Sequence, residues 1–268
     1  MVKAAGRTAD LLLRWASSLS SLRRVPVLGS FLSWFSRQLV PTGTLIWVQI
    51  QQGPAQGLWI RVNPRTGQDF QQGVVEPGVQ KAMQQHLRAG MNFYDIGANI
   101  GFFSLIGARL VGPSGSVVSF EADPEIASRL RENLNYNKLI RGAVEEMAVW
   151  SEPTTVSFAR VDSNISPDRG LGHVSTMGSS ASDSISVEAI SLDQFILSHP
   201  APDFLKCDVE GAEVAVFHGA ERLLCDKHPI LLVEMHSSEN HRVLTQKFSR
   251  LGYTCRNLDE NHVLALPQ

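Results

Sequence analysis

Cysteine is scarce in this chain of 268 residues, and the three that occur lie far apart. Cys207, Cys225 and Cys255 form no C-x-x-C pair, and an odd, scattered set argues against both a disulfide framework and a zinc site. Free thiols are typical of reducing compartments, so we expect a cytoplasmic protein. No apolar run reaches the ~18 residues that a membrane-spanning helix requires.

A marked excess of charge of either sign is also missing. The formal net charge is -2, and charged residues make up 19% of the chain. So small a net charge produces no long-range field that would attract nucleic acid. The predicted core also lacks a basic stripe with interleaved aromatic residues. Both absences argue against DNA or RNA as substrate or partner.

Residues 1–43 differ in composition from the rest of the chain. This segment has several basic residues and only one acid, Asp10, and leucine and aromatic residues are interleaved among them. Such a basic amphipathic arm can lie on an anionic membrane surface, which makes residues 1–40 a candidate peripheral membrane contact. The alternative is a helical arm packed on the domain or on a second subunit. A secretory signal is not expected, because Arg14 interrupts the apolar region.

The remaining sequence predicts a β-hairpin lead-in over residues 44–75 and a large domain over residues 76–268. Apolar strands alternate with helices, which predicts a doubly wound α/β sheet built from parallel βαβ units. After a first strand at 93–96, the expected strands are residues 116–120, 144–149, 203–209 and 229–235. Residues 212–224 are expected to form one helix, and residues 253–257 and 262–266 a closing antiparallel pair. The Ser-, Gly- and Asp-rich stretch 151–182 is a candidate substrate lid or a disordered insertion.

A turn of small residues separates the first strand from a helix. Gly97, Ala98, Asn99 and Gly101 follow the strand, and Phe102 begins the helix. Glycine lets a ligand approach the backbone, and a helix N-terminus offers free N–H groups. The dinucleotide fingerprint G-x-G-x-x-G would need glycine at positions 95, 97 and 100, and only position 97 has it. The turn therefore argues against a nicotinamide-dependent oxidoreductase.

Two acids at strand ends indicate which ligand this turn suits. Asp95 would repel a pyrophosphate and suits an ammonium or a hydroxyl group. Glu121 follows the next strand, at the position that holds a ribose diol in nucleotide-binding α/β folds. An amino group, a ribose and no phosphate describe S-adenosylmethionine. The alternative is an ordinary βαβ unit with an acid in a loop.

A second group of ionisable residues stands at the ends of the fourth and fifth strands. Alternation places Lys206 and Asp208 on one side of the fourth strand, together with Glu210 if the strand stays extended. Glu234 and His236 share a side of the fifth strand for the same reason. Ionisable groups within apolar strands are costly to bury without partners, so all five are candidate catalytic residues.

Three roles are open for this second group. One of its acids, or His236 with its ordinary pKa near neutrality, can be the general base that takes a proton from a substrate hydroxyl. The same oxygens and imidazole can instead hold a divalent ion, but their spacing is not diagnostic and no metal is predicted. The third role is a structural network in which Lys206 pairs with carboxylates and Glu210 caps the following helix.

Five segments, in the same order, resemble motifs of the FkbM family of S-adenosylmethionine-dependent methyltransferases. Residues 93–104 (FYDIGANIGFFS) are similar to the first motif. Residues 115–124, which end in FEADP, are similar to the next, although that family more often has proline where Ala122 stands. The later segments are SLDQF at 191–195, KCDVEGAE at 206–213, and residues 218–220 with 229–236. The resemblance covers roughly residues 70–260 and leaves out the first forty or so.

The resemblance implies a class I methyltransferase (Rossmann-like) fold and O-methylation of a hydroxyl on a saccharide or small natural product. By analogy with class I methyltransferases, the methionine and ribose of the cofactor would be lined by Asp95, Gly97, Ala98, Asn99, Gly101 and Phe102. Glu121 would take the ribose hydroxyls, and Glu76 would reach the methionine end. The adenine edge would be formed by Ala122 and Asp123, with Glu146 or Ala148.

A non-catalytic scaffold protein that retains the methyltransferase fold is the rival from a different functional class. Loss of the glycine turn or of Asp208 would support it, and neither is lost. The Asn/Asp-Pro-Pro-aromatic motif of amine methylation is absent after the fourth strand, where residues 207–210 read CDVE. This absence argues against methylation of a nucleobase amine.

Overall fold

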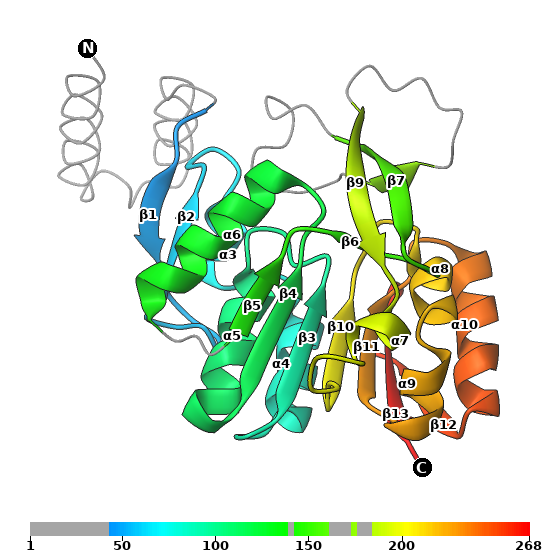
Figure 1. The fold of residues 1–268 in the computed structure, drawn as a ribbon. Coiled ribbons are helices and arrows are strands. Elements are labelled where there is room, and N and C mark those ends of the chain that lie inside the picture. Colours follow the sequence, from blue (N-terminus) through cyan, green and yellow to red (C-terminus); the bar gives the residue numbers. More distant parts are fainter. Residues whose placement is uncertain (1–42, 139–141, 161–172, 176–183) are drawn as a thin grey trace, which may run out of the picture.

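The computed structural model of this chain describes residues 43–138, 142–160, 173–175 and 184–268. Its centre is a seven-stranded sheet in the order β12-β13-β11-β10-β3-β4-β5 (Figure 1). The parallel strands are β3 (Asn92–Ile96), β4 (Ser116–Phe120), β5 (Gly142–Glu145), β10 (Phe204–Cys207) and β11 (Ile230–Glu234). β13 (His262–Pro267) runs antiparallel to β11 and to β12 (Tyr253–Asn257). The predicted doubly wound sheet with its closing antiparallel pair is confirmed.

Helices cover both faces of this sheet (Figure 1). One face packs against α4 (Pro77–His86), α5 (Phe102–Val111) and α6 (Pro124–Asn137). The other packs against α7 (Leu192–Phe195), α8 (Glu213–His218), α9 (Glu221–Asp226) and α10 (Ser238–Arg250). The short α3 (Gln68–Gln72) and the 3-10 turn Gly112–Ser114 complete the helical elements of the described residues. Each helix therefore buries its apolar stripe against strands that are apolar on both sides.

Alternation along the strands divides the core into two halves. Phe93 and Phe204 point toward the face covered by α4 and α5, whereas their neighbours Tyr94 and Leu205 point to the opposite face. All four are fully buried, and burial of one such side chain stabilises the fold by about 1.5–3 kcal/mol. The core therefore fixes which side chains at the strand ends face the α4–α5 side.

Two smaller sheets accompany the central one. β1 (Ile46–Gln49) and β2 (Trp59–Val62) pair antiparallel, as predicted for the hairpin before the domain. A four-stranded sheet has the order β6-β9-β7-β8, with β6 (Ala148–Val149), β7 (Thr154–Ala159), β8 (His173–Ser175) and β9 (Ser184–Ile190). Figure 1 shows this second sheet beyond the carboxyl-terminal edge of the central strands.

Two predicted elements are divided in the structure. The expected strand 144–149 is two strands: β5 belongs to the central sheet, and β6 pairs with β9 in the smaller one. The expected helix 212–224 is interrupted at Gly219 and becomes α8 and α9. A side chain at Gly219 would place its Cβ 2.2 Å from the carbonyl oxygen of Trp150. Close packing against a distant segment, which local periodicity does not reveal, thus requires glycine at the point where the helix is interrupted.

Some expectations fall outside the described residues. The basic arm predicted over residues 1–43 lies there except for Gly43, and so does most of the candidate lid over residues 151–182. Within the part of the chain that is described, no helix combines the length and apolarity needed to cross a membrane.

Candidate active site

The candidate site lies where the strand order of the central sheet reverses, between β3 and β10. β3 is followed in the sequence by a connection to β4 on one side, and β10 by a connection to β11 on the other. Ligands of open α/β sheets bind outside the carboxyl ends of the strands at such a switch point. All candidate residues from the two acidic groups stand at this edge or in the turns that leave it.

The glycine turn fits tightly against the end of β10. Gly97 has φ +74°, and a Cβ there would lie 1.7 Å from the backbone oxygen of Asp208. The N–H groups of Gly97 and Ala98 both donate to the carbonyl of Phe120 at the end of β4. Gly101, at φ +89°, precedes α5, and its Cβ would meet Leu130 at 2.4 Å. The turn therefore needs glycine for close approach of backbone and side chains from three elements.

Asp95 is fully buried beneath this turn. Its Oδ2 accepts a hydrogen bond from Ser104 Oγ at 2.6 Å, while its Oδ1 has no hydrogen-bond partner among the described residues. Burial raises the pKa of Asp95, and the nearby charge of Lys206 opposes that rise. A buried oxygen without a donor is costly, so Asp95 suits a ligand that brings a donor such as an ammonium group.

Glu121 accepts two backbone hydrogen bonds at the end of β4. The donors are the N–H groups of Asn99 and Asp123, both at 2.9 Å. Burial raises the pKa of Glu121 to about 7 despite these hydrogen bonds. Asn99 itself has φ +49°, and its side-chain oxygen accepts from the N–H of Ile100. The turn thus places Asn99 beside Glu121 and holds the Glu121 carboxylate in a fixed orientation.

The residues predicted for the adenine edge separate into three environments. Ala122 and Ala148 join one apolar cluster with residues of the smaller sheet, including Phe158. Asp123 caps α6 by accepting from the N–H of Glu125, as predicted, and its carboxylate also binds Arg160 through two hydrogen bonds of 2.7 and 2.8 Å. Glu146 lies apart from both, because its carboxylate pairs with Arg131 at the surface.

The second ionisable group is connected by short contacts. The ammonium of Lys206 lies 3.1 Å from Oδ2 of Asp208 and 4.8 Å from the ring centre of Phe103. Burial would lower the pKa of Lys206, but the charges of Asp208 and Asp95 outweigh it and raise the pKa well above its usual range. Burial would raise the pKa of Asp208, but Lys206 holds it below its usual range. Lys206 is therefore a permanent cation and Asp208 an anion.

His236 faces this ion pair from the end of β11. Its Nε2 lies 3.2 Å from Glu210 and 3.8 Å from both Asp208 and Glu234. Its Nδ1 lies 2.7 Å from Oε1 of the buried Glu213. Hydrogen bonds to Glu210 and Glu213 raise the pKa of His236 to about 10. At neutral pH the ring is an imidazolium, which cannot take a proton from a substrate.

Glu210 reaches this group differently from the prediction. β10 ends at Cys207, and Glu210 has φ +52°, so the strand does not stay extended to this position. The turn nevertheless directs its carboxylate to His236. Glu210 does not cap the next helix, because the residue at the N-cap of α8 is Ala212, without a side-chain hydrogen bond. The capping role considered for Glu210 is therefore wrong.

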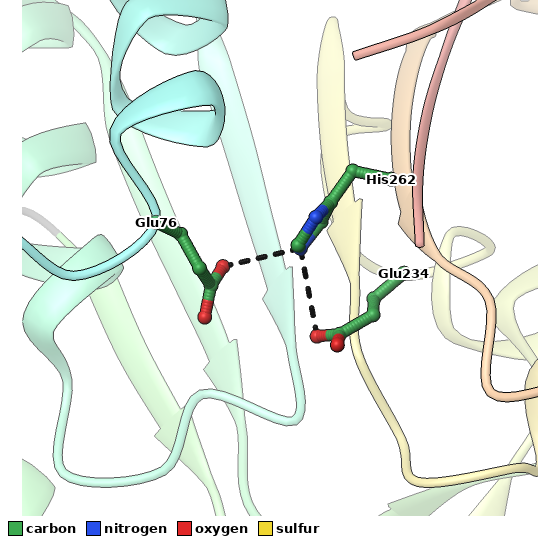
Figure 2. A group of neighbouring side chains, drawn as sticks. All are labelled: Glu76, Glu234 and His262. Carbon is green, nitrogen blue, oxygen red and sulfur yellow. Dashed lines mark ion pairs between the residues drawn. The ribbon is translucent and has the colours of Figure 1, made fainter. Parts of the chain in front are cut away.

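Glu234 joins the first histidine to a second one, His262. One oxygen of Glu234 faces His236, and the other lies 3.6 Å from Nε2 of His262. Glu76 approaches the same nitrogen to 3.3 Å from the start of α4 (Figure 2). Burial would lower the pKa of His262, but Glu234, Glu76 and Asp259 raise it to about 10. Burial is the main cause that raises the pKa of Glu234.

Sequence reasoning assigned no role to Glu213, His262, Asp259 or Arg160. A signal existed for Glu213, which stands in the KCDVEGAE segment. His262 is the register partner of Glu234 across two antiparallel strands, and that register is not readable from the sequence.

The site residues fit S-adenosylmethionine by their chemistry. The glycine turn permits close backbone approach, Asp95 has an unsatisfied buried oxygen for a donor, and Glu121 presents a fixed carboxylate for hydroxyl groups. Ala122 and Ala148 belong to one apolar cluster, and the adenine base is the part of the cofactor that apolar side chains would contact.

Comparison with known proteins also indicates a methyltransferase. A model of the methyltransferase FkbM domain matches residues 95–255. The hexuronic acid methyltransferase AglP from Haloferax volcanii is 27% identical over 181 residues, which are 65% of this chain and 70% of AglP.

Two solved structures are similar to part of this chain. Methyltransferase FkbM from Methylobacillus flagellatus shares 19% identity with a TM-score of 0.49, over 73% of this chain and 46% of that one. This chain thus spans less than half of that protein. An S-adenosylmethionine-dependent O-methyltransferase from Thermotoga maritima shares 15% identity with a TM-score of 0.44, over 73% of this chain and 67% of that one.

Proposed function

Because this chain belongs to the methyltransferase FkbM family and is an S-adenosylmethionine-dependent methyltransferase, we propose that it methylates a hydroxyl oxygen of a saccharide or a small natural product. The observation that carries the proposal is the ionic chain of Lys206, Asp208 and His236 at the ends of β10 and β11. These strand ends adjoin the glycine turn, so an acceptor held there would lie next to the cofactor. The similarity to a hexuronic acid methyltransferase supports a saccharide acceptor.

The cofactor supplies an electrophilic methyl group on a sulfonium when it is bound. We assign its methionine and ribose to the turn from Asp95 to Phe102, with Glu121 for the ribose hydroxyls. We assign the adenine to the apolar cluster that includes Ala122 and Ala148, with Asp123 at its edge. A place at the adenine edge has less support for Glu146, since its carboxylate is already paired with Arg131 at the surface.

We assign to Asp208 the role of accepting the proton of the acceptor hydroxyl. Methyl transfer needs the hydroxyl aligned with the methyl group and relieved of its proton as the new C–O bond forms. Asp208 is ionised and can accept that proton, whereas His236 and Lys206 are already protonated at neutral pH. His236 instead positions Asp208, Glu210 and Glu234, and its positive charge keeps these acids from repelling one another.

An acceptor screen tests this function. Purified enzyme would be incubated with S-adenosylmethionine and separate panels of hexuronic acids, neutral sugars and small phenols or alcohols. We expect a methyl ether on at least one saccharide or small natural-product hydroxyl, identified by mass spectrometry and located by NMR. Methylation confined to amines or to protein carboxylates, in panels that include them, would contradict the proposed acceptor class.

A titration with S-adenosylhomocysteine tests the cofactor assignment separately. A ligand that binds only the folded state raises the melting temperature by mass action. We expect saturable stabilisation by S-adenosylhomocysteine and none by NAD. Asp95→Ala should abolish that stabilisation, and unchanged affinity in this variant would show that the turn is not the cofactor site.

A further inference from the structure

Three side chains that can bind a metal ion, from separate parts of the chain, converge beside the proposed catalytic site. Glu76 precedes α4 with φ +41°, Glu234 ends β11, and His262 begins β13. Glu234 and His262 are direct partners in the antiparallel register. Figure 2 shows the two carboxylates on either side of the imidazole edge, and one ligand atom from each residue lies within 4.8 Å of the others.

The contacts in this group are longer than those of a hydrogen-bonded ion pair. Nε2 of His262 is 3.3 Å from Glu76 and 3.6 Å from Glu234, whereas charge-assisted hydrogen bonds measure about 2.7–2.9 Å. Nε2 of His262 and Oε2 of Glu76 are both buried without a hydrogen-bond partner in the described chain. The side chain of His262 is only 8% exposed, so water does not readily replace the missing hydrogen bond of Nε2.

A metal ion accounts for these separations. Zn²⁺ binds histidine nitrogen and carboxylate oxygen at about 2.0–2.2 Å in tetrahedral geometry, which places neighbouring ligand atoms roughly 3.3–3.6 Å apart. The two distances from Nε2 of His262 fall in that range. An ion at the centre of the group would give both orphaned atoms a partner.

Asp259 holds the histidine in the orientation that a metal ligand requires. Its two oxygens lie 2.9 and 3.0 Å from Nδ1 of His262, on the ring edge away from the glutamates. The Asp259 carboxylate is itself fixed by the backbone N–H groups of Asn261 and His262. A carboxylate that binds the far nitrogen of a histidine is the usual support of a metal-bound imidazole. Nε2 is thereby directed at Glu76 and Glu234.

We propose that Glu76, Glu234 and His262 bind a divalent transition-metal ion, with Zn²⁺ as the ion to test first. One imidazole and two carboxylates suit Zn²⁺ better than Mg²⁺ or Ca²⁺, which prefer oxygen ligands throughout. The ion would take the place of the Nε2 proton. The second oxygen of Glu234 lies 3.8 Å from Nε2 of His236, so the ion would also fix the orientation of a carboxylate that faces this positioning residue. Binding of the ion does not depend on the proposed methyl acceptor.

The neighbouring group of Asp208, Glu210 and His236 is the alternative location for an ion. These residues are also close enough to share one. Their histidine is more exposed, at 21% of its side chain against 8% for His262. The orphaned nitrogen of His262 favours the group that contains Glu76.

Calorimetric titration of the metal-free full chain with ZnCl₂ tests the proposal. We expect one equivalent to bind the wild type, and Zn²⁺ to raise its melting temperature. Glu76→Gln should weaken binding at least tenfold, and Asp259→Asn about 10- to 100-fold. Glu210→Gln, which removes a ligand from the neighbouring group only, and the exposed Glu260→Gln should both retain wild-type affinity.

Three results would overturn the proposal. They are the absence of Zn²⁺ binding to folded wild type, equal affinity in wild type and Glu76→Gln, and loss of binding in Glu210→Gln alone. His262→Asn is a supporting variant, but His262 is buried and its replacement can unfold the chain. Glu76 is 30% exposed, so its variant is the decisive one. S-adenosylhomocysteine titration of Glu76→Gln in EDTA separates loss of the ion from loss of the cofactor contact assigned to Glu76.

Discussion

Nδ1 of His236 lies 2.7 Å from Oε1 of Glu213, whose side chain has no exposed surface. Glu213 also accepts hydrogen bonds from the N–H of Gly211 and from the side chain of Asn240, so its position is fixed from three directions. These contacts outweigh burial and hold the pKa of Glu213 below its usual range. A fixed anion behind the ring keeps His236 protonated and turned toward the acids of the site.

Glu213→Gln should therefore lower the pKa of His236 from about 10. Removal of an adjacent opposite charge lowers a histidine pKa by about 1–3 pH units, because the imidazolium loses its electrostatic support. NMR titration of the His236 ring in both proteins measures the change. Glu239→Gln is the matched control, since Glu239 pairs with Arg242 at the surface. An unaltered titration in Glu213→Gln would refute the positioning role.

Gly97→Ala should destabilise the protein more than Gly252→Ala. Both glycines have positive φ, at +74° and +81°, which costs an alanine about 1–2 kcal/mol. A Cβ at Gly252 meets nothing within 4 Å, whereas one at Gly97 lies 1.7 Å from the oxygen of Asp208. Denaturant unfolding of the two variants separates the backbone strain from the steric clash. Equal losses would mean that the turn and β10 do not pack as described.

The high pKa of Glu121 predicts a contribution to stability that falls as pH rises. Its pKa is raised from 4.5 to about 7 by burial, so between these values the folded protein holds more protons at this site than the unfolded chain. The free energy of unfolding then decreases with pH, by about 3 kcal/mol across this window. Glu121→Gln should remove this component. Unfolding curves at pH 4.5, 6 and 8 for both proteins measure it, and parallel pH dependences would contradict the assignment.

The Arg160–Asp123 pair should stabilise the fold more than a surface pair does. Its two hydrogen bonds join the end of β7 to the start of α6, and the side chains are 20% and 12% exposed. Arg160→Gln should cost about 1.5–3 kcal/mol, the range for hydrogen bonds to charged groups. Arg131→Gln breaks the Arg131–Glu146 pair, whose side chains are 40% and 41% exposed, and should cost less than about 1 kcal/mol. Midpoints of denaturant unfolding, compared at a constant m-value, give both losses of unfolding free energy. A larger loss in Arg131→Gln than in Arg160→Gln would be evidence against the packing of the smaller sheet.

Local sequence pattern was sufficient to predict the central sheet and one part of the site. Alternation and helix signals placed β3, β4, β10 and β11, and the acids at their ends followed from strand position alone. The N-cap role of Asp123 was equally local, since Pro124 follows it directly.

The features that sequence reasoning missed depend on contacts between distant segments. The break between α8 and α9 falls at Gly219, which packs closely on the backbone of Trp150 in the connection from β6 to β7. Glu213 and His236 meet only when the start of α8 is placed beside the end of β11. His262 faces Glu234 because of a strand register that neighbouring residues do not encode. A helix cap was one of the roles left open for Glu210, because its left-handed backbone conformation is not readable from the sequence.

The most direct test of the account is the rate of methyl transfer by Asp208→Asn. The variant keeps the size of the side chain and removes the anion that accepts the hydroxyl proton. With an acceptor from the screen, we expect kcat to fall about 10²- to 10⁴-fold while the Kd for S-adenosylhomocysteine stays within a few fold of wild type. Full turnover by Asp208→Asn would show that the proton is accepted elsewhere and would contradict the proposed mechanism.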